Sequence, residues 1–145
     1  MNLPDIVEAI KVRLEDVDGV RPFAYPPDSI SPGQGDVVII APAPQLIEYH
    51  EAFNGGLADF KLTLEVWVQM TSERSAFGRI YSLLSSGTGE PRSIIDVLMS
   101  GDRTYGGVCS HVVVEDASNV RAENTAEGAR YLTAEIGCHV LVGRT

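Results

Sequence analysis

Thiol and imidazole side chains lie close together near the C-terminal end of the sequence. Cys109 and His111 are two residues apart, and His139 falls in a later apolar segment that could run beside them. Zinc is bound by cysteine and histidine, so three such side chains on one face would make a metal site. However, Cys-x-His is not a usual metal spacing, and Cys138 is expected to face away from His139. The alternative is two polar-face histidines and a packed thiol, and we expect no metal and no cofactor.

A glycine-rich turn, Gly87-Thr88-Gly89-Glu90-Pro91-Arg92, is the candidate for binding a phosphate. A nucleotide-binding loop needs converging backbone amides, usually followed by Lys and then Ser or Thr. Here no Lys follows, and Pro91 removes one amide. The sequence also has no GxSxG nucleophile motif. We therefore interpret this segment as a turn between two helices.

Carboxylates gather at two places, in Glu15, Asp16 and Asp18 and in Glu115-Asp116. General acid catalysis requires a carboxyl group in an apolar cleft that raises its pKa. Both groups of carboxylates occur in polar surroundings, at a helix end and at a strand end. We expect solvated surface charges, and we predict that the protein is not an enzyme.

The charge and length of the chain limit its partners. It has 11 basic and 20 acidic residues among 145, a net charge of −9. Affinity for nucleic acid comes mostly from Lys and Arg, so the protein is not expected to hold DNA. The charge either keeps the protein soluble or forms a surface past which DNA slides. The longest apolar run, residues 37–41, is far shorter than the roughly 20 residues that span a bilayer, so we expect no membrane partner.

One domain over residues 1–145 has to position these side chains, since the chain has the size of one core. Three helices are predicted: residues 4–18, a helix that Thr71 or Ser72 caps, and a short helix from Ser93 to Gly101. A Pro-rich loop is expected over residues 22–35, because proline supplies no amide for a strand ladder.

The strands are predicted from alternation of apolar and polar residues. Residues 37–40 form a short strand that Pro42 and Pro44 end, and residues 46–70 form a long hairpin around Asn54-Gly55-Gly56. Two further strands cover 108–115 and 131–142, separated by a polar segment from Asp116 to Ala129. Strands joined in this way favour a mostly antiparallel sheet with helices on one face, an α+β fold with a long projecting hairpin.

Two features of the long hairpin suggest an interface between subunits. Trp67 lies on the otherwise polar face of the strand over 62–70, where a lone aromatic residue often contacts a partner. The alternative is that helices cover that face. Tyr49, His50 and Phe53 flank the turn, and aromatic residues on a projecting hairpin could bind a neighbouring subunit. Alternatively, the hairpin folds back onto its own domain.

The order of these elements resembles that of the tail terminator and tail-completion proteins of long-tailed bacteriophages. The resemblance runs from the N-terminal helix through Tyr25-Pro26-Pro27-Asp28 and the strand 37–42 to the hairpin. It continues with the helix over 73–85, the helix over 93–99, the strand entry Gly106-Gly107-Val108 and the strand 131–142. It covers nearly all of the chain as a pattern of elements, without a diagnostic motif.

This resemblance implies a structural protein of the virion neck, assembled in the host cytoplasm. It implies a homohexamer ring that caps the tail tube, joins it to the head and lets DNA pass through its lumen without specific binding. The direct partners would be the tail tube protein and head–tail connector proteins. A ring needs a heterologous interface, in which one patch meets a different patch on the next subunit. The alternatives are another head–tail connector or adaptor protein, or a small metal- or ligand-binding domain.

Overall fold

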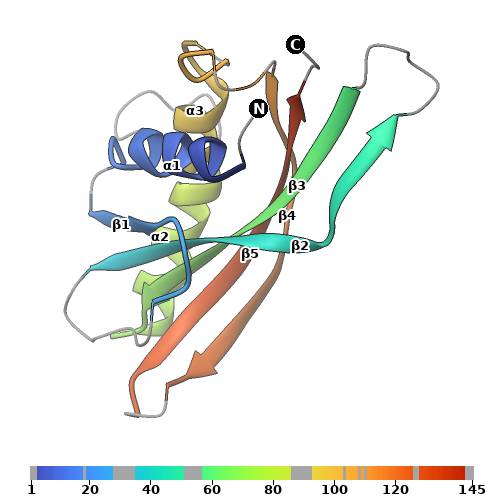
Figure 1. Cartoon of the computed structure of the whole chain (residues 1–145). Helices are drawn as coiled ribbons and strands as arrows, with labels where there is room; N and C mark the ends of the chain where they lie inside the picture. The colour runs from blue at the N-terminus through green and yellow to red at the C-terminus, as the bar shows by residue number, and fades with distance from the viewer. Residues whose placement is uncertain are drawn as a thin grey trace.

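The chain folds into a mostly antiparallel sheet with helices on one face, so the predicted α+β class is confirmed (Figure 1). The computed structural model describes residues 3–17, 19–27, 35–50, 57–85, 93–102, 104–107, 109, 111–125 and 128–142. Within these ranges, the side chains of residues 45, 48–50 and 57–58 are not described. The described strands form one five-stranded sheet in the order β1-β2-β3-β5-β4.

The described helices are α1 (Leu3–Leu14), α2 (Glu73–Leu84) and α3 (Ile94–Met99). Both of the last two begin where predicted, and each has a serine cap. The Ser72 hydroxyl accepts from the Ser75 amide at 3.2 Å, and the Ser93 hydroxyl accepts from the Asp96 amide at 3.0 Å. The predicted extension of the first helix to residue 18 is wrong. After Leu14 the chain continues in tighter turns, which still bury Val17 in the core.

The first two strands differ from the prediction. β1 (Val20–Phe23) pairs in parallel with β2 (Asp36–His50), although Pro22 placed this segment in a loop. Proline is tolerated there because β1 is an edge strand. β2 continues through Pro42 and Pro44, which were expected to end it. The pairing of β2 with its neighbour shifts register between Pro42 and Ile47, so the prolines occupy an irregular part of the ladder.

The other strands are β3 (Leu57–Gln69), β4 (His111–Asn124) and β5 (Arg130–Val142), paired antiparallel. β2 and β3 form the predicted long hairpin, with His50 opposite Leu57. β4 is longer than expected and includes most of the segment from Asp116 to Ala129 that was predicted to separate two strands. Residues 115–122 of β4 are exposed on both faces, so no apolar alternation marks them as a strand.

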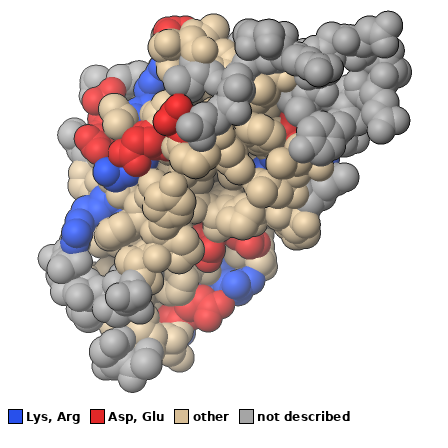
Figure 2. Space-filling view, viewed as in Figure 1, with Lys and Arg blue, Asp and Glu red and all other residues tan. Residues whose placement is uncertain are grey.

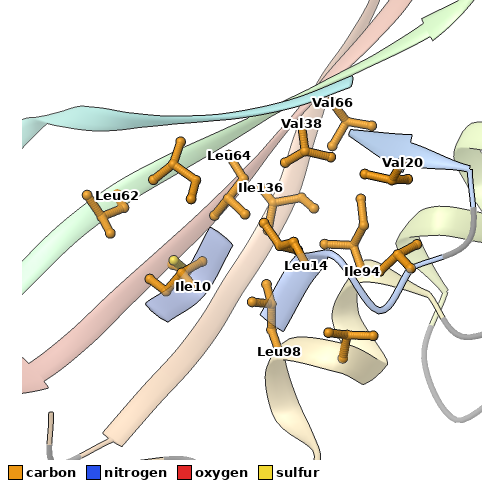
Figure 3. Close-up of a cluster of buried hydrophobic side chains, with 14 of the residues drawn as sticks. Ile10, Leu14, Val20, Val38, Leu62, Leu64, Val66, Ile94, Leu98 and Ile136 are labelled. Carbon is orange, nitrogen blue, oxygen red and sulfur yellow. The ribbon is translucent and has the colours of Figure 1, made fainter. Parts of the chain in front are cut away.

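The core lies between the helices and one face of the sheet (Figure 3). Ile10 and Leu14 from α1 and Ile94 and Leu98 from α3 meet this face. The strand residues that they contact alternate along the sheet: Val38, Leu62, Leu64, Val66 and Ile136. Burial of such side chains is the main stabilising contribution to the fold.

Two hairpin ends extend past the helical layer in opposite directions (Figure 1). The paired ends of β2 and β3 run to one side, and the paired ends of β4 and β5 run to the other. The described ends of β2 and β3 lie beyond the helical layer, whereas the predicted projecting tip, residues 51–56, lies outside the described residues.

Candidate interaction surface

We call the sheet face opposite the helices the outer face. On β3 it consists of alternate residues that are half-buried: Lys61, Thr63, Glu65, Trp67 and Gln69. Their neighbours on β5 are Tyr131, Thr133, Glu135, Gly137 and His139, and Leu141 lies opposite Asp59. The buried side chains of the described helices belong to the core on the opposite face. The described helices therefore do not cover the outer face, although Val37, Tyr131 and Thr133 on it are buried within the chain.

Trp67 lies at the centre of the apolar end of the outer face. It pairs with Val37 on one side and Thr133 on the other, and its ring is 5.7 Å from the Tyr131 ring in an edge-on arrangement. Its indole Nε1 is buried without a hydrogen-bond partner among the described residues. The alternative that helices cover this face is wrong for the helices described, whereas the role of Trp67 in an interface stays a prediction.

The other three predicted interface residues belong to the β2–β3 hairpin. Tyr49 and His50 lie at the end of β2, where their backbones pair with Ala58 and Leu57. Phe53 lies outside the described residues, as do the side chains of Tyr49 and His50. The backbone therefore places two of these residues on the projecting end of the hairpin, and their contacts stay a prediction.

His139 contacts a carboxylate through each ring nitrogen. Its Nδ1 is 3.3 Å from Asp59 Oδ1 on β3, and its Nε2 is 3.4 Å from Glu115 Oε1 on β4. His139 thus links the three strands across the outer face. His111 lies diagonally adjacent on the same face, because it pairs with Leu141 while His139 pairs with Val113.

The Cys/His/His combination considered from the sequence is not assembled as one site. Cys109 is buried in the core, with its Sγ 3.5 Å from the carbonyl oxygen of Thr104. Cys138 also faces the core, away from His139, as expected. Within the described ranges, no three His, Cys, Asp or Glu side chains are grouped so that they could hold a metal ion.

Burial raises the pKa values of both thiols. It raises the pKa of Cys138 to about 12, and the negative charge of Glu115 adds to the effect. Burial likewise raises the pKa of Cys109 above its ordinary value. Both side chains therefore stay protonated near neutral pH and pack as small apolar groups.

A β-bulge brings two consecutive carboxylates to the outer face. Val114 pairs with Cys138 and Asp116 pairs with Gly137, so Glu115 is the extra residue in β4. Glu115 reaches His139, while Asp116 lies over Gly137. A Cβ atom at position 137 would be 2.6 Å from Asp116 Oδ1, so the glycine makes room for this carboxylate.

A second irregularity follows between Ser118 and Arg121. Asn119 has a φ of 59°, a conformation that asparagine tolerates better than most residues. Its side-chain amide donates to Glu135 Oε2 at 2.6 Å. Glu135 lies directly opposite Glu65, so this hydrogen bond partly offsets the repulsion between like charges on neighbouring strands.

Arg13 organises the turn that leads from α3 to β4. Its guanidinium donates to the carbonyl oxygens of Ser100 at 2.9 Å and Asp102 at 2.6 Å, and lies 4.0 Å from the centre of the Tyr105 ring. The Asp102 carboxylate accepts from Thr104 and from the Gly106 amide, and these hydrogen bonds lower its pKa, with that to the Thr104 side chain the main cause. Arg13 thus has a structural role that the sequence did not predict.

An apolar groove of about 220 Å³ opens on the other side of the sheet, beside the start of α1. Leu3, Pro4 and Val7 of α1 form one wall. The other walls are formed mainly by the segment after β1 and by the β2–β3 hairpin: Tyr25, Pro26, Ala41, Pro42, Leu46 and Leu62. No sequence pattern predicts this groove, because its walls come from segments far apart along the chain.

The remaining candidates are surface groups or lie outside the description. Glu15 and Asp16 are exposed, and Glu15 pairs with Lys11 at 3.7 Å. Figure 2 shows acidic and basic side chains interspersed on this side of the molecule. Asp18 and the turn over residues 87–92 lie outside the described residues.

Comparison with protein-family models and with curated proteins finds no match to this chain. Among the described helices, none is both long and apolar enough to cross a membrane.

Proposed function

We propose that this protein is a structural subunit of the neck of a long-tailed bacteriophage, a tail-terminator-like protein that forms a ring on the tail tube. In this role it resides in the virion, contacts the tail tube protein and the head–tail connector, and carries no catalytic site. The observation that supports the proposal best is the arrangement of the sheet. One face is packed by helices, the outer face is free of described helices, and a long hairpin extends beyond the body.

This arrangement suits a heterologous interface. A ring requires that one surface of each subunit meet a different surface of the next. The β2–β3 hairpin end and the outer-face region around Trp67 are two such surfaces, because they occupy different parts of the sheet. The net charge of −9 favours a lumen through which DNA moves without being held.

Negative-stain electron microscopy and native mass spectrometry of the concentrated protein test this proposal. We expect rings with a central hole wide enough for duplex DNA, and a mass that is an integral multiple of the subunit. Purified tail tubes should be tested as well, because assembly could require the tube. Failure to form rings alone and failure to bind tube ends would together reject the proposal.

Variants separate assembly from folding. Trp67→Ala and deletion of residues 49–53 should reduce the assembled mass more than they reduce thermal stability. Thr63→Ala, on the same strand face, is the matched control and should leave both unchanged. A small metal- or ligand-binding domain is the alternative of a different class. Metal analysis, with melting in the presence and absence of a chelator, distinguishes it.

A further inference from the structure

The apolar groove and the exposed face of α2 carry complementary chemical groups and charges. The groove is lined almost entirely by apolar groups and has room for an aromatic ring, since cavities of roughly 150 Å³ bind benzene. It opens to solvent, so a tyrosine ring could lie in it with its hydroxyl in water. The ligand class is therefore a single aromatic side chain.

The chain exposes such a side chain on α2. Tyr81 is 59% exposed, and outside the groove it is the exposed aromatic residue among those described. Its ring packs against that of Phe77, with the ring centres 5.8 Å apart. An aromatic side chain held in this way binds a pocket with little loss of conformational freedom.

The surroundings of Tyr81 would let another chain approach. At helical spacing, Arg74, Gly78 and Tyr81 share one outward stripe, with Arg74 and Tyr81 about 10 Å apart along the axis. Gly78 has open space where a Cβ would lie, so no side chain at the middle of the stripe would keep another chain away from the helix backbone. Arg74 is exposed and forms no ion pair with the part of the chain that the structure describes.

The rim of the groove carries the opposite charge. Glu8 lies one helical turn after the groove residue Pro4, on the same side of α1. Lys11 is shared between Glu8 at 3.6 Å and Glu15 at 3.7 Å, so this stripe keeps an excess negative charge. An arginine from a partner could therefore pair with Glu8 while an aromatic ring fills the groove.

We infer that the groove binds Tyr81 of a second copy of this chain, with Arg74 of that copy placed beside Glu8. This contact is heterologous, because the groove and α2 are different surfaces of the subunit. The groove adjoins Pro42 and Leu46 of the β2–β3 hairpin, whereas α2 directly follows β3. That the contact lies within a ring rests on the proposed function. Self-association through the groove and Tyr81 is expected whether or not a ring forms.

Sedimentation velocity over a concentration series, with the full chain, measures the contact. Tyr81→Ala should weaken self-association by about 30-fold, as truncation of a central aromatic residue often does. Tyr81→Phe should retain it. Val120→Ala, an exposed apolar residue on β4, is the matched control and should leave association unchanged. Each variant is first compared with the parent by thermal melting.

Charge exchange tests the pairing independently of folding. Glu8→Arg and Arg74→Glu should each weaken association, and the double variant should restore it. Gly78→Gln places a long side chain in the middle of the stripe. Because glycine is a poor helix former, this variant should melt at the same or a higher temperature while losing association.

The outcomes separate this inference from the proposed ring. Oligomers that depend on Tyr81, Arg74 and Glu8 but form open filaments would support the contact and reject the ring. Rings that still form when Tyr81, Arg74 or Glu8 is substituted would support the proposed function and overturn the groove contact. A strict monomer at every concentration would overturn the contact, and tube binding would then decide the neck function.

Discussion

The two faces of the sheet differ in residue pattern and in the contacts that their side chains make, although the same strands build both. On β3 and β5 the core face has apolar residues at every second position, and it packs against the helices. The outer face combines an aromatic pair, a histidine between two carboxylates and two bulges in β4. Hydrophobic burial specifies the first, whereas local polar geometry specifies the second. Substitutions at adjacent residues, one on each face, compare the two.

The largest expected effect comes from Leu64 and its neighbour Glu65. Leu64 is completely buried, so Leu64→Ala should reduce the free energy of unfolding by about 2–5 kcal/mol. Glu65→Gln on the outer face should change it by no more than about 0.5 kcal/mol, and could increase it because Glu135 lies opposite. Urea denaturation measures both. Similar losses for the two variants would contradict the comparison.

A second comparison uses pH at Cys138. Burial raises the pKa of this thiol to about 12, above the ordinary value of 9.0. Because the folded form holds the proton more tightly, this contribution is fully present below pH 9 and is lost as the pH rises towards 12. The free energy of unfolding should fall there by up to about 1.4 kcal/mol per pH unit. Cys138→Val should flatten that slope, which denaturation at pH 8 to 11 would measure.

The adjacent outer-face residue, His139, should have a smaller effect at neutral pH. His139→Ala removes a partner of the buried Asp59 carboxylate and should cost about 1–2 kcal/mol. Asp59→Asn should reduce that cost, because the carboxylate is then absent. His111→Ala is the control, as His111 lies on the same face without this pair of carboxylate contacts. Equal losses at the two histidines would show that the contacts contribute nothing specific.

Sequence patterns predicted the core face well because its requirement is periodic. Alternation over Leu62–Met70 and Leu132–Val142 identified the buried residues of β3 and β5, and Ser72 and Ser93 identified two helix starts. Periodicity could not predict the outer-face contacts. The bulge at Glu115 depends on pairing with β5, and the contact between Asp59 and His139 joins residues 80 positions apart.

The candidate interaction surface was predictable to a similar, limited extent. Trp67 could be found because a single residue breaks the polar pattern of its strand face. The groove could not, since Pro4, Tyr25 and Leu62 come together only when α1 and the hairpin have packed. The extension of β2 through Pro42 and Pro44 was missed for a related reason. The register shift that accommodates the prolines arises from pairing with β3 rather than from local sequence.

The smallest expected effect tests whether the bulge and Gly137 act together. Gly137→Ala places a Cβ against the Asp116 carboxylate, which is exposed and can move away at modest cost. We expect a loss of about 1 kcal/mol or less in the parent chain. In an Asp116→Ala background the same substitution should stabilise by about 0.5–1 kcal/mol, since glycine weakens a strand interior. A change of sign across this double-mutant cycle would show that Gly137 is retained for the carboxylate on the outer face. The same effect in both backgrounds would mean that the bulge tolerates a side chain at position 137, and that local polar geometry specifies less of this face than we infer.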